Sequence, residues 1–152
     1  MLIEMELREI CRSTDMNAVV LREKEGDNRQ FPIYIGIYEA SALEMAIHEQ
    51  NAPRPLTHDL VLKVLGGMGG KLKRIIVDKL EQDTFFSKLD IELKDHTSAW
   101  VDSRPSDALV LASKLKVPIF ADESVLDKAN AVPSPDDDFD IDDLDDLDDL
   151  DE

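Results

Sequence analysis

The chain has 152 residues and a formal net charge of −17, from 34 acidic and 17 basic side chains. This length suits one domain, and the single cysteine, Cys11, excludes an intrachain disulfide and favours a reducing compartment. The first residues lack the basic start and apolar run of a signal peptide, and no apolar stretch approaches the roughly 20 residues of a membrane span. We therefore expect a cytoplasmic protein without a membrane segment, in which Cys11 is a buried structural thiol.

The acidic residues are unevenly distributed. Residues 136–152 hold twelve of the 34 acids and no Lys or Arg, which leaves 22 acids against 17 bases, a net charge of −5, in residues 1–135. The Pro-containing segment 131–135 and the Asp/Leu repeats after it predict a domain over 1–132 and a disordered tail over 133–152. A strongly acidic chain argues against a nucleic-acid partner, but this distribution allows a local basic surface on the domain.

The first part of the domain predicts a sheet followed by a helix. Apolar and polar residues alternate around Met5 and again over 18–21, as in two strands joined by a hairpin at 13–15. A third strand over 31–36 contains a proline near its start. It leads directly into a helix over 38–49, where apolar residues recur at helical spacing.

The second part predicts further helices and strands. A helix over 57–65 ends at the glycines of 66–70, which lack the Lys–Ser/Thr pair of a phosphate-binding loop and are interpreted as a helix stop. The later elements are strands over 72–80, 85–93 and 98–101, a helix over 105–115, a strand over 117–120 and a helix over 123–129. Consecutive strands favour an α+β fold with a mixed, largely antiparallel sheet and packed helices.

Two segments share one pattern, Arg54-Pro55-Leu56-Thr57-His58-Asp59 and Arg104-Pro105-Ser106-Asp107. Each places an Arg before a Pro, then a hydroxyl and an Asp, at the start of a predicted helix. The proline keeps the Arg extended and the helix start supplies free N–H groups, so Arg54, Thr57, Arg104 and Ser106 are candidate phosphate ligands. Alternatively, Thr57 and Ser106 cap their helices and each Arg pairs with its own Asp.

Hydrolysis of a phosphodiester also needs a base or a metal-bound hydroxide. The candidate groups are Glu39, His58, Asp59, Asp78, Asp102 and Asp107. The sequence has no H-E-x-x-H or C-x-x-C spacing, so a metal site depends on individual carboxylates. His58 beside Asp59 suits a general base, or is a solvent-exposed histidine of a helix start. Asp78 lies at the mouth of a cleft or marks a turn.

Other functional classes have weaker support. No G-x-S-x-G sequence is present, which argues against a serine hydrolase of that type. A surface that stacks unpaired bases is possible through Tyr34, Tyr38, Phe85, Phe86 or Trp100. Strand alternation instead favours the core for most of these rings.

Five segments together resemble the bifunctional nuclease domain family, over roughly residues 2–130. They are 31–36 (FPIYIG), 39–40 (EA), 54–59 (RPLTHD), 83–86 (DTFF) and 102–108 (DSRPSDA). The family takes its name from DNase and RNase activity of plant members, so the resemblance implies hydrolysis of DNA and RNA. It implies no particular catalytic residues, and it leaves the Asp/Leu tail unexplained.

The leading hypothesis is a metal-assisted nuclease that acts on DNA or RNA. Catalysis is assigned to His58, Asp59 and Glu39, and a divalent ion such as Mg²⁺ or Mn²⁺ to Glu39, Asp59 and Asp107. The alternative is a non-catalytic regulatory module that binds an anion or nucleic acid. We also expect a homo-oligomer, most simply a dimer. The tail either solubilises the chain or competes with nucleic acid as a tethered polyanion.

Overall fold

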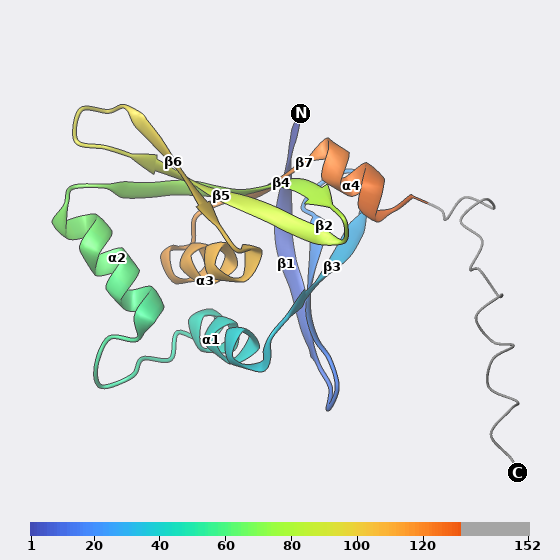
Figure 1. Cartoon of the computed structure of the whole chain (residues 1–152), viewed down its shortest axis with the longest axis horizontal. Helices are drawn as coiled ribbons and strands as arrows, with labels where there is room; N and C mark the ends of the chain where they lie inside the picture. The colour runs from blue at the N-terminus through green and yellow to red at the C-terminus, as the bar shows by residue number, and fades with distance from the viewer. Residues whose placement is uncertain (132–152) are drawn as a thin grey trace, which may run out of the picture.

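The computed structural model describes residues 1–131, which form a seven-stranded sheet and four helices (Figure 1). In chain order the elements are β1 (Leu2–Arg12), β2 (Asn17–Glu23), β3 (Gln30–Ile35), α1 (Ile37–Ile47), α2 (Thr57–Gly67), β4 (Lys71–Glu81), β5 (Thr84–Glu92), β6 (Ser98–Ser103), α3 (Pro105–Leu115), β7 (Ile119–Asp122) and α4 (Glu123–Ala129). The predicted order of strands and helices is confirmed, with element ends shifted by a few residues. The predicted tail lies outside the described residues.

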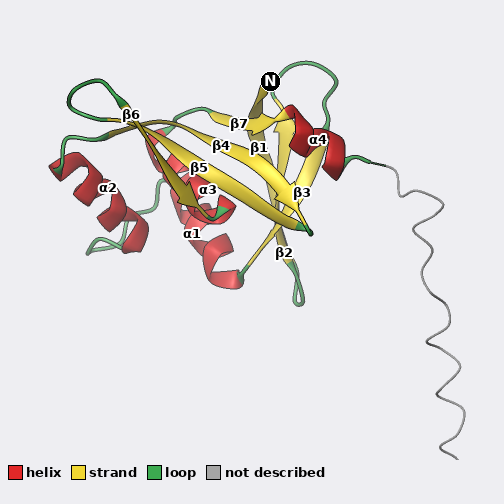
Figure 2. Cartoon of the chain, turned by 45° about the horizontal axis from the view of Figure 1, so that its top comes forward, coloured by secondary structure: helices red, strands yellow, loops and turns green. Residues whose placement is uncertain are grey.

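The sheet has the strand order β3-β2-β1-β7-β4-β5-β6. All neighbouring pairs are antiparallel except β7 and β4, which run parallel with Ile119 opposite Ile75. The prediction of a mixed, largely antiparallel sheet is therefore confirmed. The chain reaches the centre of the sheet last, because α3 carries it from the edge strand β6 back to β7 (Figure 2).

Helices cover both faces of the sheet. Helix α3 packs on β4 and β5 and also contacts α1, whereas α4 packs on β4 and β7 from the other side (Figures 1 and 2). The core between these layers includes the fully buried side chains of Leu21, Phe31 and Leu109. Phe31 stacks on Phe85, with 5.3 Å between the ring centroids. No helix within residues 1–131 is long and apolar enough to cross a membrane.

The turn between β4 and β5 has an unusual backbone. Gln82 and Asp83 have φ values of 48° and 60°, so both lie in the left-handed region. A two-residue turn of this kind matches the twist of the hairpin, although Gly and Asn are the residues that adopt it most readily. Asp83 in this turn and the start of α3 line the same cavity, which is described below.

Two burial predictions are wrong. Cys11 is exposed, because it lies near the end of β1 where the β1–β2 hairpin extends beyond the layers of the domain (Figure 1). The aromatic side chains predicted for the core are also largely at the surface, with Tyr34 64%, Tyr38 84%, Trp100 50% and Phe86 38% exposed. Phe85 alone among them is half-buried against the core. Each exposed ring lies on the outer face of a strand or at a helix start, which alternation alone does not distinguish from the inner face.

Candidate functional site

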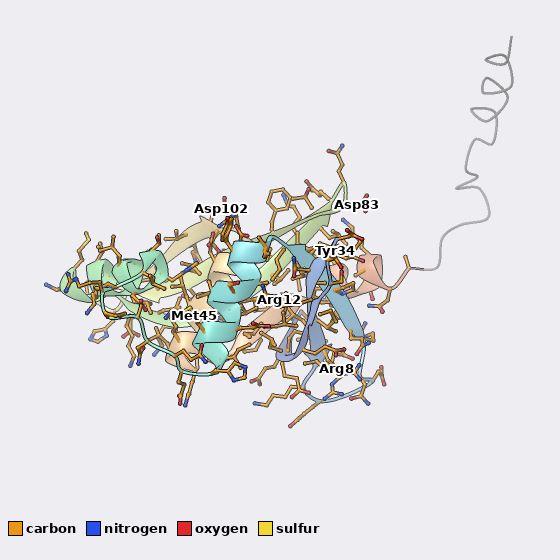
Figure 3. All side chains as sticks on the ribbon, turned by 90° about the horizontal axis from the view of Figure 1, so that it is seen from below. Arg8, Arg12, Tyr34, Met45, Asp83 and Asp102 are labelled. Atoms are coloured by element: carbon orange, nitrogen blue, oxygen red, sulfur yellow. The ribbon has the colours of Figure 1, made fainter. Side chains whose placement is uncertain are left out.

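A cavity of about 410 Å³ lies where the start of α1, the start of α3 and the β4–β5 turn meet. Its walls are the end of β3 with Tyr34, the turn with Asp83 and the helix starts with Glu39 and Arg104. Tyr34 and Asp83 are labelled in Figure 3. Three chain segments that are distant in sequence therefore contribute polar side chains to one opening.

Arg104 is at the centre of the polar side chains. It is the N-cap residue of α3, with φ −68° and ψ 146°, the extended conformation that the following proline favours. Its Nε and Nη2 donate to the two oxygens of Asp107 at 2.8 and 3.1 Å, and its Nη1 donates to Oε1 of Glu39 at 3.2 Å. A guanidinium carries five N–H groups, so two of them carry no bond to these partners. The side chain is 63% exposed, which leaves those donors accessible to an anion.

Asp107 connects Arg104 to His58. Nε2 of His58 lies 2.9 Å from Oδ1 of Asp107, and only 19% of the His58 side chain is exposed. The Arg104 guanidinium, and secondarily His58, holds the pKa of Asp107 below its ordinary value. The same contacts, first with Asp107 and then with Glu39, raise the pKa of Arg104, so its positive charge is permanent. The two Arg–Pro segments therefore converge through this hydrogen bond.

Glu39 lies against the backbone of Gly36, the N-cap residue of α1. A Cβ atom added at Gly36 would overlap the Glu39 carboxylate, although the backbone there, at φ −74°, suits any residue. The absence of a side chain at this position therefore provides the space that the carboxylate occupies. Oε1 of Glu39 accepts from Arg104, and Oε2 has no hydrogen-bond donor within residues 1–131. Glu39 thus presents one free carboxylate oxygen at the cavity.

Asp59 has a different environment from the other predicted acids. Its Oδ1 lies 2.7 Å from Nζ of Lys114, and its Oδ2 accepts from the backbone N–H of Leu56 at 2.9 Å. These two contacts hold the pKa of Asp59 below its ordinary value and fasten the start of α2 to α3. The alternative in which each Arg pairs with its own Asp holds for Arg104 and Asp107 but not for Arg54, which forms no ion pair within the described chain. Neither Asp59 nor Arg54 lines the cavity.

The alternative interpretation of Thr57 and Ser106 as helix caps is not confirmed. The N-cap residue of α2 is Leu56, one position before Thr57, and that of α3 is Arg104, two positions before Ser106. Neither N-cap side chain accepts a hydrogen bond from the helix backbone. Thr57 is exposed at the first turn of α2 and does not line the cavity. Ser106, only 7% exposed, lines the cavity beside Arg104. Of the two hydroxyls, Ser106 alone is placed to meet a ligand there.

The two remaining acids lie outside this group. Asp78 is on β4 and its Oδ2 is 3.6 Å from Nζ of Lys88. Asp102, labelled in Figure 3, is exposed on β6 and faces Lys88 in the strand register. Neither side chain lines the cavity. Both belong to the charged surface of the β4–β6 sheet.

The carboxylates do not form a protein cage for a metal. Within residues 1–131 no three His, Cys, Asp or Glu side chains are grouped as a ligand set, and Asp107 and Asp59 already use their oxygens in the contacts described above. Mg²⁺ is commonly held by one or two carboxylates together with water and substrate phosphate. The free oxygen of Glu39 suits that arrangement, with Asp107 as the nearby second acid. The predicted trio with Asp59 is not brought together.

Sequence reasoning missed several residues of the cavity and its surroundings, including Gly36, Asp83 and Lys114 as the partner of Asp59. One signal for the cavity was present in the sequence. Four of the five segments that resemble the nuclease family contribute residues to its walls, namely 31–36, 39–40, 83–86 and 102–108. Because these segments meet at one cavity, the residues that resemble the family outline the cavity and not one catalytic residue.

Comparison with known proteins agrees with this pattern. The model of the bifunctional nuclease domain family matches residues 19–134, and the chain belongs to this family. It is 38% identical over 111 residues to an uncharacterized protein of Mycobacterium tuberculosis, covering 73% of this chain and 65% of that protein. It is 32% identical over 120 residues to bifunctional nuclease 2 of Oryza sativa subsp. japonica, and 28% over 104 residues to bifunctional nuclease 1 of Arabidopsis thaliana.

Each match covers a larger fraction of this chain than of the relative. The rice match covers 78% of this chain but 37% of the rice protein, and the Arabidopsis match covers 67% of this chain and 32% of that protein. The chain therefore spans about two thirds of the mycobacterial relative and about one third of the plant nucleases. What it shares with them is the domain that carries the cavity.

Proposed function

We propose that this chain hydrolyses phosphodiester bonds of nucleic acid at the cavity between α1 and α3. The observation that supports this proposal is the hydrogen-bonded chain Glu39–Arg104–Asp107–His58, which joins three helix starts in a protein of the bifunctional nuclease family. A permanent cation with free donors and a carboxylate with a free oxygen are adjacent in it. These are the groups that bind a phosphate and accept the proton of an attacking water.

The roles of the residues follow from their positions. Arg104 binds a non-bridging phosphate oxygen through its two remaining N–H groups, and Ser106 lies beside it. Glu39 accepts the proton of the water whose oxygen bonds to phosphorus, while the P–O bond to the leaving sugar oxygen breaks and that oxygen takes a proton from solvent. His58 does not line the cavity, so it acts through Asp107, whose orientation toward Arg104 it fixes. Thr57, Arg54 and Asp59 are not assigned a contact with the substrate.

We also propose that a divalent ion such as Mg²⁺ or Mn²⁺ assists, which Glu39 would hold together with water and the substrate phosphate. Such an ion would polarise the phosphate and lower the pKa of a bound water. The Glu39 carboxylate would contribute negative charge to the ion. The salt bridge between Glu39 and Arg104 holds the Glu39 carboxylate at the cavity.

The decisive experiment compares Glu39→Gln with a matched control on the same helix. Glu44→Gln alters an acid of α1 that pairs with Arg12 outside the cavity. Cleavage of labelled DNA and RNA is measured with purified protein in Mg²⁺, in Mn²⁺ and in chelator. We expect Glu39→Gln to lower the rate by at least about 100-fold, in keeping with the loss of a general base, and Glu44→Gln to retain it. Unchanged cleavage by Glu39→Gln would exclude this site.

A second function is supported by the pairing of the acids. Both Asp107 and Asp59 are engaged by basic side chains, and no three-residue ligand set is present in the described part of the chain. This arrangement also suits a non-catalytic module that binds a phosphate-bearing ligand at Arg104. Metal-independent binding of an oligonucleotide without any turnover, abolished by Arg104→Ala, would favour this module over the nuclease.

A further inference from the structure

A second cavity adjoins the one that contains Arg104. Its volume is about 460 Å³, and it lies between the β1–β2 hairpin and the start of α1, with Asp15, Met16 and Ile37 in its walls. The two cavities share three consecutive residues, Tyr34, Ile35 and Gly36. The end of β3 therefore forms a ridge with a hollow on each side. We call the two cavities together the Tyr34 groove.

Tyr34 is an exposed aromatic side chain on this ridge. It lies on the outer face of the edge strand β3, opposite Ala18, while its neighbour Ile33 is buried. Its side chain is 64% exposed, and Met16 and Ile37 in the second cavity are 55% and 58% exposed. Exposed apolar residues that are scattered need no explanation, but a contiguous group around a groove marks a binding surface.

The charges of the groove limit which ligand suits it. Among the residues lining the two cavities Arg104 is the one cation, and it is accompanied by the acids Asp15, Glu39 and Asp83. A duplex, which is recognised chiefly through many phosphates, requires a larger basic surface than this. A single strand is bound by stacking of its bases on aromatic rings together with cations along its backbone. The groove supplies one exposed ring, Tyr34, and one cation, Arg104, which suits a short unpaired segment with a single phosphate contact.

We propose that the Tyr34 groove binds single-stranded nucleic acid, with consecutive bases on the two sides of the Tyr34 ring and the phosphate beside the first base at Arg104. This inference rests on the proposed nuclease function and extends it by naming its substrate as an unpaired strand. A base within a duplex would first have to leave its stack, which costs a few kcal/mol, so paired substrate is disfavoured. The groove thereby selects single strands at the binding step, before any bond is broken.

The test measures binding without cleavage. Full-length protein is titrated in chelator against a fluorescent single-stranded oligonucleotide and against the same sequence as a duplex, using fluorescence anisotropy. The variants are Tyr34→Ala, Tyr34→Phe, which keeps the ring, and Tyr38→Ala. Tyr38 is a suitable control because it is 84% exposed on the adjacent helix turn but lines neither cavity. Thermal unfolding of each variant checks that the fold is retained.

We expect the single strand to bind more tightly than the duplex. Tyr34→Ala weakens single-strand binding by between about fivefold and 100-fold, the range for loss of one stacking partner, whereas Tyr34→Phe and Tyr38→Ala stay within about twofold. With a single phosphate contact, the logarithm of the affinity falls with the logarithm of salt concentration with a slope of about −0.7. Equal or tighter duplex binding, or equal effects of Tyr34→Ala and Tyr38→Ala, overturns the inference.

The outcome is separable from that of the nuclease proposal. Binding in chelator is observed whether or not the protein cleaves its ligand. If the single strand binds as expected but Glu39→Gln cleaves like the wild type, single-strand binding at the Tyr34 groove is supported and the assignment of Glu39 to catalysis is wrong. If a small phosphodiester such as bis-p-nitrophenyl phosphate is hydrolysed but Tyr34→Ala leaves oligonucleotide binding unchanged, the catalytic site stands and the groove fails.

Discussion

His58 and Asp107 are 49 positions apart in the chain, and their side chains meet at 2.9 Å between Nε2 and Oδ1. The contact joins the start of α2 to the start of α3. Helix α2 has no fully buried residue, so few apolar contacts determine its position. The hydrogen bond therefore serves two purposes: it places α2, and it fixes the Asp107 carboxylate that in turn holds Arg104.

A double-mutant cycle measures this contact. His58→Ala, Asp107→Asn and the double variant are unfolded with urea at pH 7. The two single changes should show a coupling energy of about 1 kcal/mol, because the hydrogen bond involves a charged partner but is partly exposed. The control is His96 with Glu92, which lie 3.7 Å apart with His96 86% exposed, and which should show no measurable coupling. Equal coupling in the two pairs would contradict the role given to His58.

Gly36 provides a test of the Glu39 position that leaves Glu39 itself in place. Gly36→Ala adds a Cβ that displaces the Glu39 carboxylate, while the backbone conformation tolerates alanine. We expect thermal stability close to that of the wild type and cleavage lowered by about tenfold or more, since misplacement of a base by roughly 1 Å costs up to about 100-fold.

Gly66→Ala is the matched control for this change. Gly66 lies in α2, and a Cβ added there meets nothing within 4 Å. Alanine should therefore stabilise the helix by about 0.5–1 kcal/mol and leave cleavage unchanged. If Gly36→Ala and Gly66→Ala lower cleavage equally, the effect of Gly36→Ala does not arise from displacement of the Glu39 carboxylate.

Asp59 is expected to stabilise the fold more than it contributes to chemistry. Its carboxylate pKa is lowered by Lys114 and by the N–H of Leu56, so the folded protein favours the ionised form. The resulting stability is present at neutral pH, above the ordinary pKa of 3.8, and is lost as the pH falls through the lower pKa of the folded state. Asp59→Asn should therefore be less stable than the wild type at pH 7, and the difference should shrink progressively as the pH falls below 3.8.

Urea unfolding from pH 7 to pH 3 measures this difference. Asp102→Asn, on the exposed face of β6, controls for the loss of one negative charge. The Asp59→Asn variant should still cleave under conditions where it is fully folded. Loss of cleavage in a fully folded Asp59→Asn protein would instead support the sequence-based assignment of Asp59 to catalysis or metal binding.

Much of the fold was predictable because its signals are local. Alternation around Met5, the glycines after Leu65 and Pro105 at the start of α3 each determine an element from neighbouring residues alone. The position of β7 between β1 and β4 is set by pairing across the sheet, which the sequence pattern of residues 117–120 does not contain. Burial of Tyr34 and Cys11 was mispredicted for the same reason, because alternation shows that two faces differ but not which face is covered.

The candidate site was predictable only in part. The similarity of the two Arg–Pro segments did not show whether they converge, but Arg104, Asp107, His58 and Glu39 were among the candidates. Their partners were not predictable, because Lys114 reaches Asp59 and Glu39 reaches Arg104 only after the helices pack. The role of Gly36 likewise depends on a side chain three positions later that folds back over it.

The Asp/Leu segment gives the last prediction, which depends on charge alone. Residues 133–152 contribute −12 of the net charge of −17, so a protein ending at residue 132 carries −5. If the segment competes with nucleic acid as a tethered polyanion, its removal should tighten oligonucleotide binding several-fold at about 20 mM salt and by much less at about 300 mM, where screening is strong. Anisotropy titrations at both salt concentrations measure this, with free Asp-rich peptide added in trans as the control. An affinity that does not change at low salt would leave solubility as the role of the segment, and it would leave binding to the Tyr34 groove governed by Arg104 and by stacking.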